Sequence, residues 1–411
     1  MNQQFDMVII GGGMVGTALA CALADASLNS APLKIALVET QLPVAPFNAA
    51  STVADVDMRV SALNRASETF LNTINVWQDI PAARKSAYDK MRIWDGVGTG
   101  HIQFDAAELA EEHLGHIVEN RVTAQALMHK LQQASNIQLF APQTVNNIEH
   151  LEYGNNRYVI ELASGKMLST PLIVAADGAR SFVRTWAEFD MREWDYQHHG
   201  LVCTVQTEQA HQQCCWQRFT ENGVLAFLPL SNDHLCSIVW SCPETQAQKL
   251  LAMDDESFQQ ALEAAFEGKL GKIVACGSRA AIPLRQRHAK KYVKEGIVLV
   301  GDAAHTIHPL AGQGVNLGLM DAYVLSDEIK QGLARGLPAH EPLLLARFER
   351  RRMPENLSMM ATMESFKRLF AQQTPALRWL RNWGMNKVNK LGFVKQHLAM
   401  QAMGIERHIR K

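Results

Sequence analysis

A glycine-rich segment near the N-terminus, residues 11–16 with the sequence GGGMVG, constrains the fold of this chain more than any other feature. It follows a short apolar run at 7–10 and opens a helix-like segment that leads to a second apolar run at 34–38. In a GxGxxG turn the first glycine permits a tight turn, the second lets backbone approach a pyrophosphate, and the third lets helix pack on strand. We therefore predict a strand–turn–helix–strand unit with a dinucleotide at the positive helix N-terminus. The expected contact residues are Gly11, Gly13, Met14, Val15 and Gly16.

An acidic residue, Glu39, ends the second predicted strand 23 positions after Gly16. A carboxylate there accepts hydrogen bonds from ribose hydroxyls, and its charge disfavours the 2′-phosphate of NADP. The motif does not choose between NAD and FAD, and a glycine-rich turn without a ligand is the alternative interpretation.

Two further glycine segments follow apolar runs later in the chain. The first is AADGARS at 175–181, followed by Arg184, and Asp-Gly in isolation is most often a surface turn. The second is GDAAH at 301–305, which continues through Pro309 to GQGVN at 312–316. Its small residues admit a ligand closely, and its Gly-Gln-Gly turn opens another predicted helix.

The composition favours a compact enzyme with a large core. The chain has 411 residues, 47% of them hydrophobic and 20% charged, and its formal net charge of −1 argues against a nucleic-acid binder. Its seven cysteines include no CxxC pair or zinc-like spacing, so we expect reduced thiols in a cytoplasmic protein. The apolar stretch 7–24 is interrupted by glycines and preceded by Asp6 without a cation, unlike a signal peptide.

The glycine segments lie near both ends and in the middle of the chain. This distribution predicts a two-domain fold of the α/β (α+β) class. Strands are predicted at 158–162, 172–175, 201–205, 235–240 and 297–300, and helices at 316–330 and from 342 onward. We expect a Rossmann-like nucleotide-binding domain built from 1–80, 105–182 and 285–345. An inserted β-sheet substrate domain would comprise 81–104 and 183–284, and a basic helical C-terminal segment 346–411.

These three ordered motifs together resemble the FAD-dependent aromatic hydroxylases similar to para-hydroxybenzoate hydroxylase. Within that group the chain is similar over nearly its whole length to the ubiquinone-biosynthesis hydroxylases, and most to their bacterial 2-polyprenylphenol hydroxylase branch. The segments that carry the resemblance are DMRVSAL (57–63), HLGHIVEN (113–120), WDYQHH (194–199), LAFLPLS (225–231), LCSIVWS (235–241) and VGDAAHTIHPLAGQGVNLG (300–318).

The resemblance implies FAD as cofactor and gives roles to individual residues. Glu39 and the first glycines would hold the ADP half, Arg59 would neutralise the pyrophosphate, and Asp302, after Gly301, would bind the ribityl chain. The segment 177–184 would serve FAD packing and nicotinamide access. The flavin-ring loop and the other expected contacts are Pro309, Gly312, Gln313, Gly314, Asn316, Asp177, Gly178 and Arg184, with Asn120, Arg121 and Gln125 in a segment that touches the flavin in relatives.

The implied reaction is hydroxylation of a polyprenylated phenol's ring through a flavin C4a-hydroperoxide. Reduced flavin reacts with O₂, the helix N-terminus at 314–316 would stabilise charge on the ring, and a closed apolar pocket would exclude water. The sequence contains one dinucleotide fingerprint. NAD(P)H would therefore supply electrons by binding transiently without its own Rossmann domain, or a partner protein would supply them. The alternatives are another ring position, a flavin oxidoreductase that inserts no oxygen, and a non-catalytic member of a biosynthetic complex. No general base is assigned.

Other candidates have simpler explanations. His305 and His308 lack a third ligand at helpful spacing, so no metal is expected and His305 is interpreted as structural. The neighbouring Cys214 and Cys215 are interpreted as small buried hydrophobes.

The basic C-terminal tail has two interpretations. From residue 365 onward ten Lys and Arg face one Glu, a net charge of +9, so the total of −1 leaves −10 for 1–364. Scattered cations are typical of a solvated helix face, whereas cations interleaved with Leu and Trp are typical of a segment lying on anionic lipid. The second interpretation would make a cytoplasmic enzyme peripheral to the membrane.

Overall fold

A computed structural model of the chain describes residues 2–44, 49–151, 157–306, 314–371 and 374–404. Its centre is a six-stranded sheet with five parallel strands and one antiparallel edge strand. The strands in spatial order are β11 (Ile137–Phe140), β5 (Ile35–Val38), β2 (Met7–Ile10), β15 (Ile173–Ala175), β23 (Ile297–Leu299) and β22 (Val293–Lys294). Every residue of β2, β5, β15 and β23 is buried, as expected for parallel strands covered on both faces.

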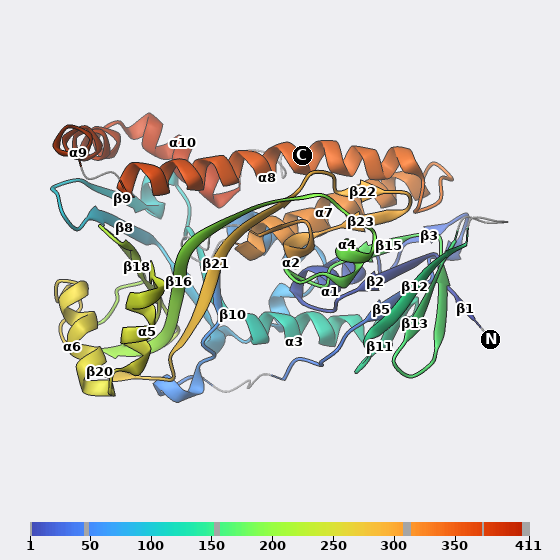
Figure 1. Ribbon diagram of the computed structural model, residues 1–411, viewed down its shortest axis with the longest axis horizontal. Helices are drawn as coiled ribbons and strands as arrows, with labels where there is room; N and C mark the ends of the chain where they lie inside the picture. Colours follow the sequence, from blue (N-terminus) through green and yellow to red (C-terminus); the bar gives the residue numbers. More distant parts are fainter. Residues whose placement is uncertain (1, 45–48, 152–156, 307–313, 372–373, 405–411) are drawn as a thin grey trace.

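Three helices that pack against one another lie beside this sheet. Helix α1 (Met14–Ala22) begins directly after the turn and packs against both α3 (Asn120–Leu131) and α7 (Gly314–Leu333). A four-stranded sheet shares the same core and lies beside it in Figure 1. Its order is β1 (Gln3–Gln4), β14 (Met167–Thr170), β13 (Arg157–Leu162) and β12 (Val145–Leu151). Strand β2, the glycine turn, α1 and β5 form the predicted strand–turn–helix–strand unit, which is thus confirmed.

The second part of the molecule is a nine-stranded sheet. Its two long strands, β16 (Met191–Thr207) and β21 (Ala280–Ala289), run from this sheet toward the six-stranded one (Figure 1). The remaining strands are β24 (His305–Thr306), β19 (Leu235–Pro243), β18 (Gly223–Pro229), β17 (Cys214–Thr220), β8 (Lys90–Asp95), β9 (His101–Asp105) and β20 (Ile273–Cys276). Helices α5 (Glu244–Ala252) and α6 (Asp255–Ala265) pack against it.

A small three-stranded sheet joins the two parts. Strand β10 (Gly115–Glu119) pairs with β6 (Val60–Asn64) on one side and with β7 (Lys85–Tyr88) on the other, and α2 (Arg65–Thr73) follows β6. Residues 81–104, expected as one piece of the substrate domain, thus divide between this sheet and the large one. The domain boundaries remain a proposal.

Helices α8 (Pro342–Ala371), α9 (Pro375–Lys390) and α10 (Gly392–Met403) end the described chain, and α9 and α10 lie over β8 and β9 (Figure 1). The predicted helical C-terminus is thus confirmed over the residues described there. Within the described ranges, no helix combines the length and the apolar character needed to cross a bilayer. The remaining short elements are α4 (Phe182–Trp186), β3 (Ser27–Leu28), β4 (Ala31–Pro32), and the 3₁₀ turns Val53–Asp55, Trp77–Asp79, Ala82–Arg84, Ala106–Leu109 and Gly301–Ala303.

Candidate active site

The first glycine turn has room for a ligand only on one side. Gly11 has φ +106°, and a Cβ there would lie 2.2 Å from the carbonyl oxygen of Ala176, so glycine is required. Gly13 caps α1, and a Cβ there would meet nothing within 4 Å. The open side therefore faces the helix N-terminus, where a phosphate is stabilised.

Glu39 lies immediately after β5 and reaches back to this turn. Its Oε2 accepts a hydrogen bond from the Gly12 N–H at 2.5 Å, and its Oε1 accepts from the backbone N–H of Thr40 at 2.7 Å. The carboxylate is thus fixed beside the turn, as the ribose-binding prediction requires.

The Gly-Asp turn at 301–303 contains the predicted cofactor residue Asp302. Asp302 is exposed between the buried residues Gly301 and Ala303, and neighbouring protein groups partly desolvate its carboxyl. This desolvation raises the pKa of Asp302, and electrostatic interaction with His305 and Arg59 opposes the rise.

The Asp-Gly segment is fastened to that turn by Arg184. This buried guanidinium donates to the carbonyl oxygens of Ala303 at 2.9 Å and Ala179 at 2.8 Å. Asp177 accepts from the backbone N–H of Val183 through Oδ2 at 3.2 Å, whereas its buried Oδ1 has no partner among the described residues. Burial raises the pKa of Asp177. Arg184 thus positions the loops, and Asp177 presents an unsatisfied oxygen.

Asn316, predicted to contact the cofactor, directs its whole amide into protein. Its Oδ1 accepts from the Ser67 hydroxyl at 2.7 Å and the Asn64 backbone N–H at 3.1 Å, and its Nδ2 donates to the Ala62 carbonyl at 2.8 Å. The residue fastens the first turn of α7 to β6 and α2. A Cβ on Gly314 would meet nothing within 4 Å. Pro309, Gly312 and Gln313 lie outside the described residues, as does His308.

The segment around Asn120 is anchored by ion pairs. Arg121 donates to Glu119 at 3.0 Å and to the Asp55 carbonyl at 2.9 Å, and the buried Arg84 binds the same Glu119 at 2.7 Å. Gln125 lies half-buried further along α3. The assignment of Arg121 and Gln125 to the cofactor stays a prediction.

Sequence reasoning missed the buried carboxylate that organises this region. Asp321 on α7 has no exposed surface and accepts from the Gly301 N–H at 3.0 Å, from His305 at 2.5 Å and from Arg352 at 2.7 Å. The structural interpretation of His305 is consistent with this contact. An acid inside the apolar run 317–325 was the signal available in the sequence.

The seven cysteines are all free, and six are buried. Burial raises the pKa of Cys214 to about 12, and the pKa of Cys215 is also raised. Neither thiol is activated for redox chemistry, which agrees with their interpretation as small hydrophobes.

An apolar cavity of about 640 Å³ extends from the first turn of α7. It lies between the large sheet and the C-terminal helices, and Asn316 and Leu317 form one part of its wall. Apolar side chains from both parts of the molecule line it, including Met91, Ile93, Phe219, Met320, Met363 and Met385.

The comparisons with known proteins agree with this geometry. The FAD binding domain family matches residues 4–360. The chain is 36% identical to 3-demethoxyubiquinol 3-hydroxylase of Escherichia coli (strain K12), covering 98% of this chain and 100% of that protein. It is 34% identical to the mitochondrial ubiquinone biosynthesis monooxygenase COQ6 of Xenopus tropicalis, covering 96% and 92%. The chain belongs to the FAD-dependent ubiquinone-biosynthesis hydroxylases.

The fold of this hydroxylase is shared with solved flavin monooxygenases. The p-nitrophenol 4-monooxygenase PnpA from Pseudomonas putida DLL-E4 superposes with a TM-score of 0.77 at 17% identity, covering 99% of this chain and 100% of that one. The predicted two-domain α/β class is confirmed, and the hydroxylase is an FAD-dependent monooxygenase.

The site itself fits FAD. The turns that follow β2 and β15 and the start of α7 each contain a glycine whose Cβ would point into open space, at Gly13, Gly178 and Gly314. The unpartnered Oδ1 of Asp177 supplies a buried acceptor in the same region, and buried acceptors require a partner.

Proposed function

We propose that this hydroxylase inserts one atom of O₂ into the aromatic ring of a polyprenylated phenol or quinol in ubiquinone biosynthesis. The apolar cavity that begins at α7 is the observation that carries the proposal, because it offers a water-poor space beside the expected flavin site. The names of the E. coli and Xenopus relatives support the same pathway.

The predicted cofactor-binding residues have positioning roles in this reaction. Glu39 and the turn at 11–16 would hold the ADP half of FAD, Arg59 its pyrophosphate and Asp302 its ribityl chain. When bound and reduced, FAD supplies the chemistry that activates O₂. The backbone N–H groups at the start of α7 would stabilise negative charge. Because the phenol oxygen of the substrate itself activates the ring, no protein base is required.

The cavity would hold the polyprenyl chain. Each buried CH₂ contributes about 0.8 kcal/mol to transfer from water, so an isoprenoid tail gains substantial binding energy from this lining. Energy of this kind, obtained far from the reacting ring, would hold the ring against the start of α7.

Labelled dioxygen tests the reaction. The purified protein with FAD, reductant and a polyprenylated phenol under ¹⁸O₂ is expected to give a product with one ¹⁸O atom on the ring. Reductant consumption with unlabelled, reduced product would establish the oxidoreductase alternative instead. Failure to bind FAD would contradict the enzyme assignment.

A glycine in the cavity wall tests where the tail binds. Gly384 lines the cavity, and a Cβ there would meet nothing within 4 Å. Gly384→Leu is expected to raise KM for a long-tailed phenol at least about 10-fold, equivalent to 1.4 kcal/mol, and to leave a short-tailed phenol unaffected. Gly392→Leu is the matched control, because Gly392 is also in a C-terminal helix with open space around it. Equal effects on both substrates would contradict the tail site.

The electron donor proposed here is NAD(P)H, bound transiently near the Asp-Gly segment. Anaerobic mixing of the FAD-loaded protein with NADH or NADPH is expected to bleach the flavin absorbance within the turnover time. Reduction only by an added electron-transfer protein would instead favour a protein donor.

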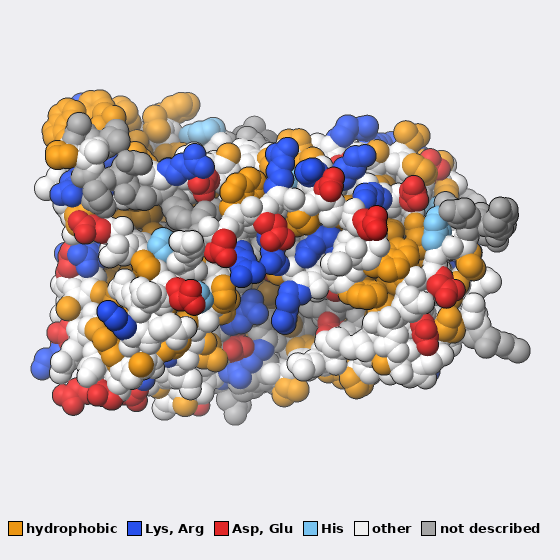
Figure 2. Space-filling model, viewed as in Figure 1, with side chains coloured by type: hydrophobic (Ala, Val, Ile, Leu, Met, Phe, Trp, Pro, Cys, Tyr) orange, Lys and Arg blue, Asp and Glu red, His pale blue; other side chains and the backbone are white. Residues whose placement is uncertain are grey.

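The surface partner proposed for the C-terminal helices is anionic lipid. Trp379 is 67% exposed and Phe393 is 84% exposed, and Figure 2 shows hydrophobic side chains gathered over α9. Exposed aromatic side chains with nearby Lys and Arg are typical of segments at a lipid surface. The protein would then work at the cytoplasmic membrane face, and membership of a protein complex is the competing outcome.

A further inference from the structure

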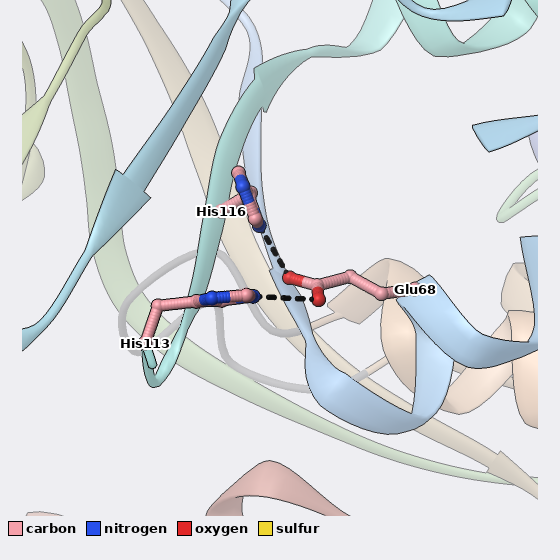
Figure 3. Close-up of side chains that lie close together, drawn as sticks. All are labelled: Glu68, His113 and His116. Carbon is pink, nitrogen blue, oxygen red and sulfur yellow. Dashed lines mark hydrogen bonds and ion pairs between the residues drawn. The ribbon is translucent and has the colours of Figure 1, made fainter. Parts of the chain in front are cut away.

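Three side chains with metal-binding atoms converge beside α2, away from the glycine turns. Glu68 projects from α2, His116 from β10, and His113 from the loop that leads into β10 (Figure 3). Their ligand atoms all lie within 4.8 Å of one another. Neither the flavin nor the tail proposal uses these residues.

The contacts between them are short and protected from solvent. Glu68 Oε1 lies 2.6 Å from Nδ1 of His116, and Oε2 lies 2.9 Å from Nε2 of His113. The side chains are 6%, 15% and 13% exposed for Glu68, His116 and His113. The two imidazoles pack edge to face with centroids 4.4 Å apart, so the groups are held in place before a ligand arrives.

Arg65 competes for the same point. Its Nη1 lies 2.6 Å from Nε2 of His113 and 2.8 Å from Oε2 of Glu68. A guanidinium only donates hydrogen bonds and an ionised carboxylate only accepts them, so one nitrogen of His113 cannot satisfy both neighbours. With Nε2 unprotonated, the imidazole and the carboxylate instead direct lone pairs toward one position that attracts a cation.

We propose that Glu68, His113 and His116 bind a transition-metal ion of the zinc type, in competition with the Arg65 side chain. Two imidazoles and one carboxylate suit zinc and similar ions, whereas magnesium prefers oxygen ligands alone. Three protein ligands leave a fourth position to water.

The surroundings allow Arg65 to leave. Its side chain is 30% exposed, and its Nη2 already lies 3.5 Å from Glu111 on the solvent side. The nearby cation Lys85 is engaged elsewhere, since it donates to the carbonyl of Trp77 at 3.0 Å and lies 4.8 Å from the centre of its ring. A metal can therefore replace the Arg65 charge without a second cation in contact.

The metal would act as a clip between α2 and β10. Ser67, next to Glu68, binds Asn316 at the start of α7, so a fixed α2 also fixes that helix.

The wild-type protein gives the first test, with zinc and magnesium chlorides as probes. FAD-loaded protein, freed of metal by chelator and dialysed, is expected to bind one Zn²⁺ per chain by calorimetry and to melt at a higher temperature with Zn²⁺. Mg²⁺ at the same concentration is expected to do neither. No Zn²⁺ binding, or equal effects of the two ions, overturns the proposal.

Variants then locate the ion. Glu68→Gln and His113→Gln are each expected to weaken Zn²⁺ binding more than about 100-fold, because even changes outside the ligand set cost 10–100-fold. Arg65→Ala is expected to tighten binding about 10-fold. His129→Gln, which alters the exposed pair with Asp79 in the same part of the chain, is the matched control. Unchanged affinity in the two ligand variants, or weaker binding in Arg65→Ala, overturns the site, and the wild-type melting shift tests it even if a variant fails to fold.

Discussion

At the scale of single residues, Asp321 connects three elements that the expected flavin site requires. It receives hydrogen bonds from the Gly301 turn, from His305 on β24 and from Arg352 on α8, all without access to water. These interactions lower the pKa of Asp321 although burial opposes them. Altering a buried carboxylate with several donors lowers the free energy of unfolding, because the donors left without it cannot form hydrogen bonds to water.

Replacing Asp321 by Asn is expected to destabilise the protein by about 3 kcal/mol, since it leaves the buried Arg352 charge incompletely paired. The turn before Asp302 also loses its charged acceptor, so FAD retention is expected to weaken about 10-fold. Urea unfolding and FAD dissociation measure the two effects. Asp327→Asn, on the same helix but in a partly exposed pair with Arg351, should cost less than about 1 kcal/mol. Equal losses in both variants would contradict the role of Asp321.

His288 makes stability sensitive to pH. Burial, together with the nearby His305 and Arg192, lowers the pKa of His288 to about 4, so the native state resists its protonation. The neutral ring therefore contributes stability above pH 6.5, which is lost as the pH falls toward 4, on the order of 3 kcal/mol in all. Denaturant unfolding from pH 7 to pH 4 should show this slope. In His288→Gln it should be shallower, and in His129→Gln, an exposed site, unchanged.

At the scale of elements, local patterns were predictable and remote pairings were not. The apolar runs 7–10 and 297–300 and the glycine turns are short-range signals, and they gave the strands and the helix starts of the nucleotide-binding part. The pairing of β7 with β10 joins residues far apart in sequence. The contacts of Asp321 and the Glu68 cluster likewise depend on tertiary packing, which no local periodicity encodes.

The C-terminal charges illustrate the same limit. From the sequence, all the tail cations are expected on one exposed surface. In the structure, however, Arg381 is buried and binds Asp95 of β8 at 2.5 Å, and Lys395 pairs with Glu108. Part of the +9 charge therefore fastens α9 and α10 to the body.

Breaking this attachment tests the element directly. Asp95→Asn is expected to cost about 3 kcal/mol, because Arg381 is left buried without a full countercharge. Hydrogen exchange in α9 should rise more than exchange in α1. Glu364→Gln, which alters an exposed pair with Arg368, should leave exchange in α9 unchanged. Similar exchange in Asp95→Asn and wild type would contradict the attachment.

At the scale of the whole molecule, charge is separated along the chain, with −10 on residues 1–364 and +9 on the remainder. Exposed aromatic side chains lie on the positive part. The proposed lipid contact thus combines apolar insertion with an attraction that salt screens within about 10 Å at 0.1 M.

Vesicles containing phosphatidylglycerol are expected to bind the protein, with weaker binding at high salt. The double variant Trp379→Ser, Phe393→Ser should lose most of this binding. Trp194→Ser, at a 48% exposed Trp on the large sheet, should retain it. Co-sedimentation measures all three, and binding that ignores salt or the double variant would argue against the lipid contact.

The position of α9 and α10 over the cavity also sets an order of assembly. The ribosome makes these helices after the other described elements, and residue 404 packs back against Ala66, which was made hundreds of residues earlier. Domains fold as they emerge during synthesis, so the nucleotide-binding part can form while the cavity still lacks one wall. A chain that stopped before α9 would therefore carry the expected cofactor site without an enclosed cavity, and synthesis of α9 and α10 adds the missing wall.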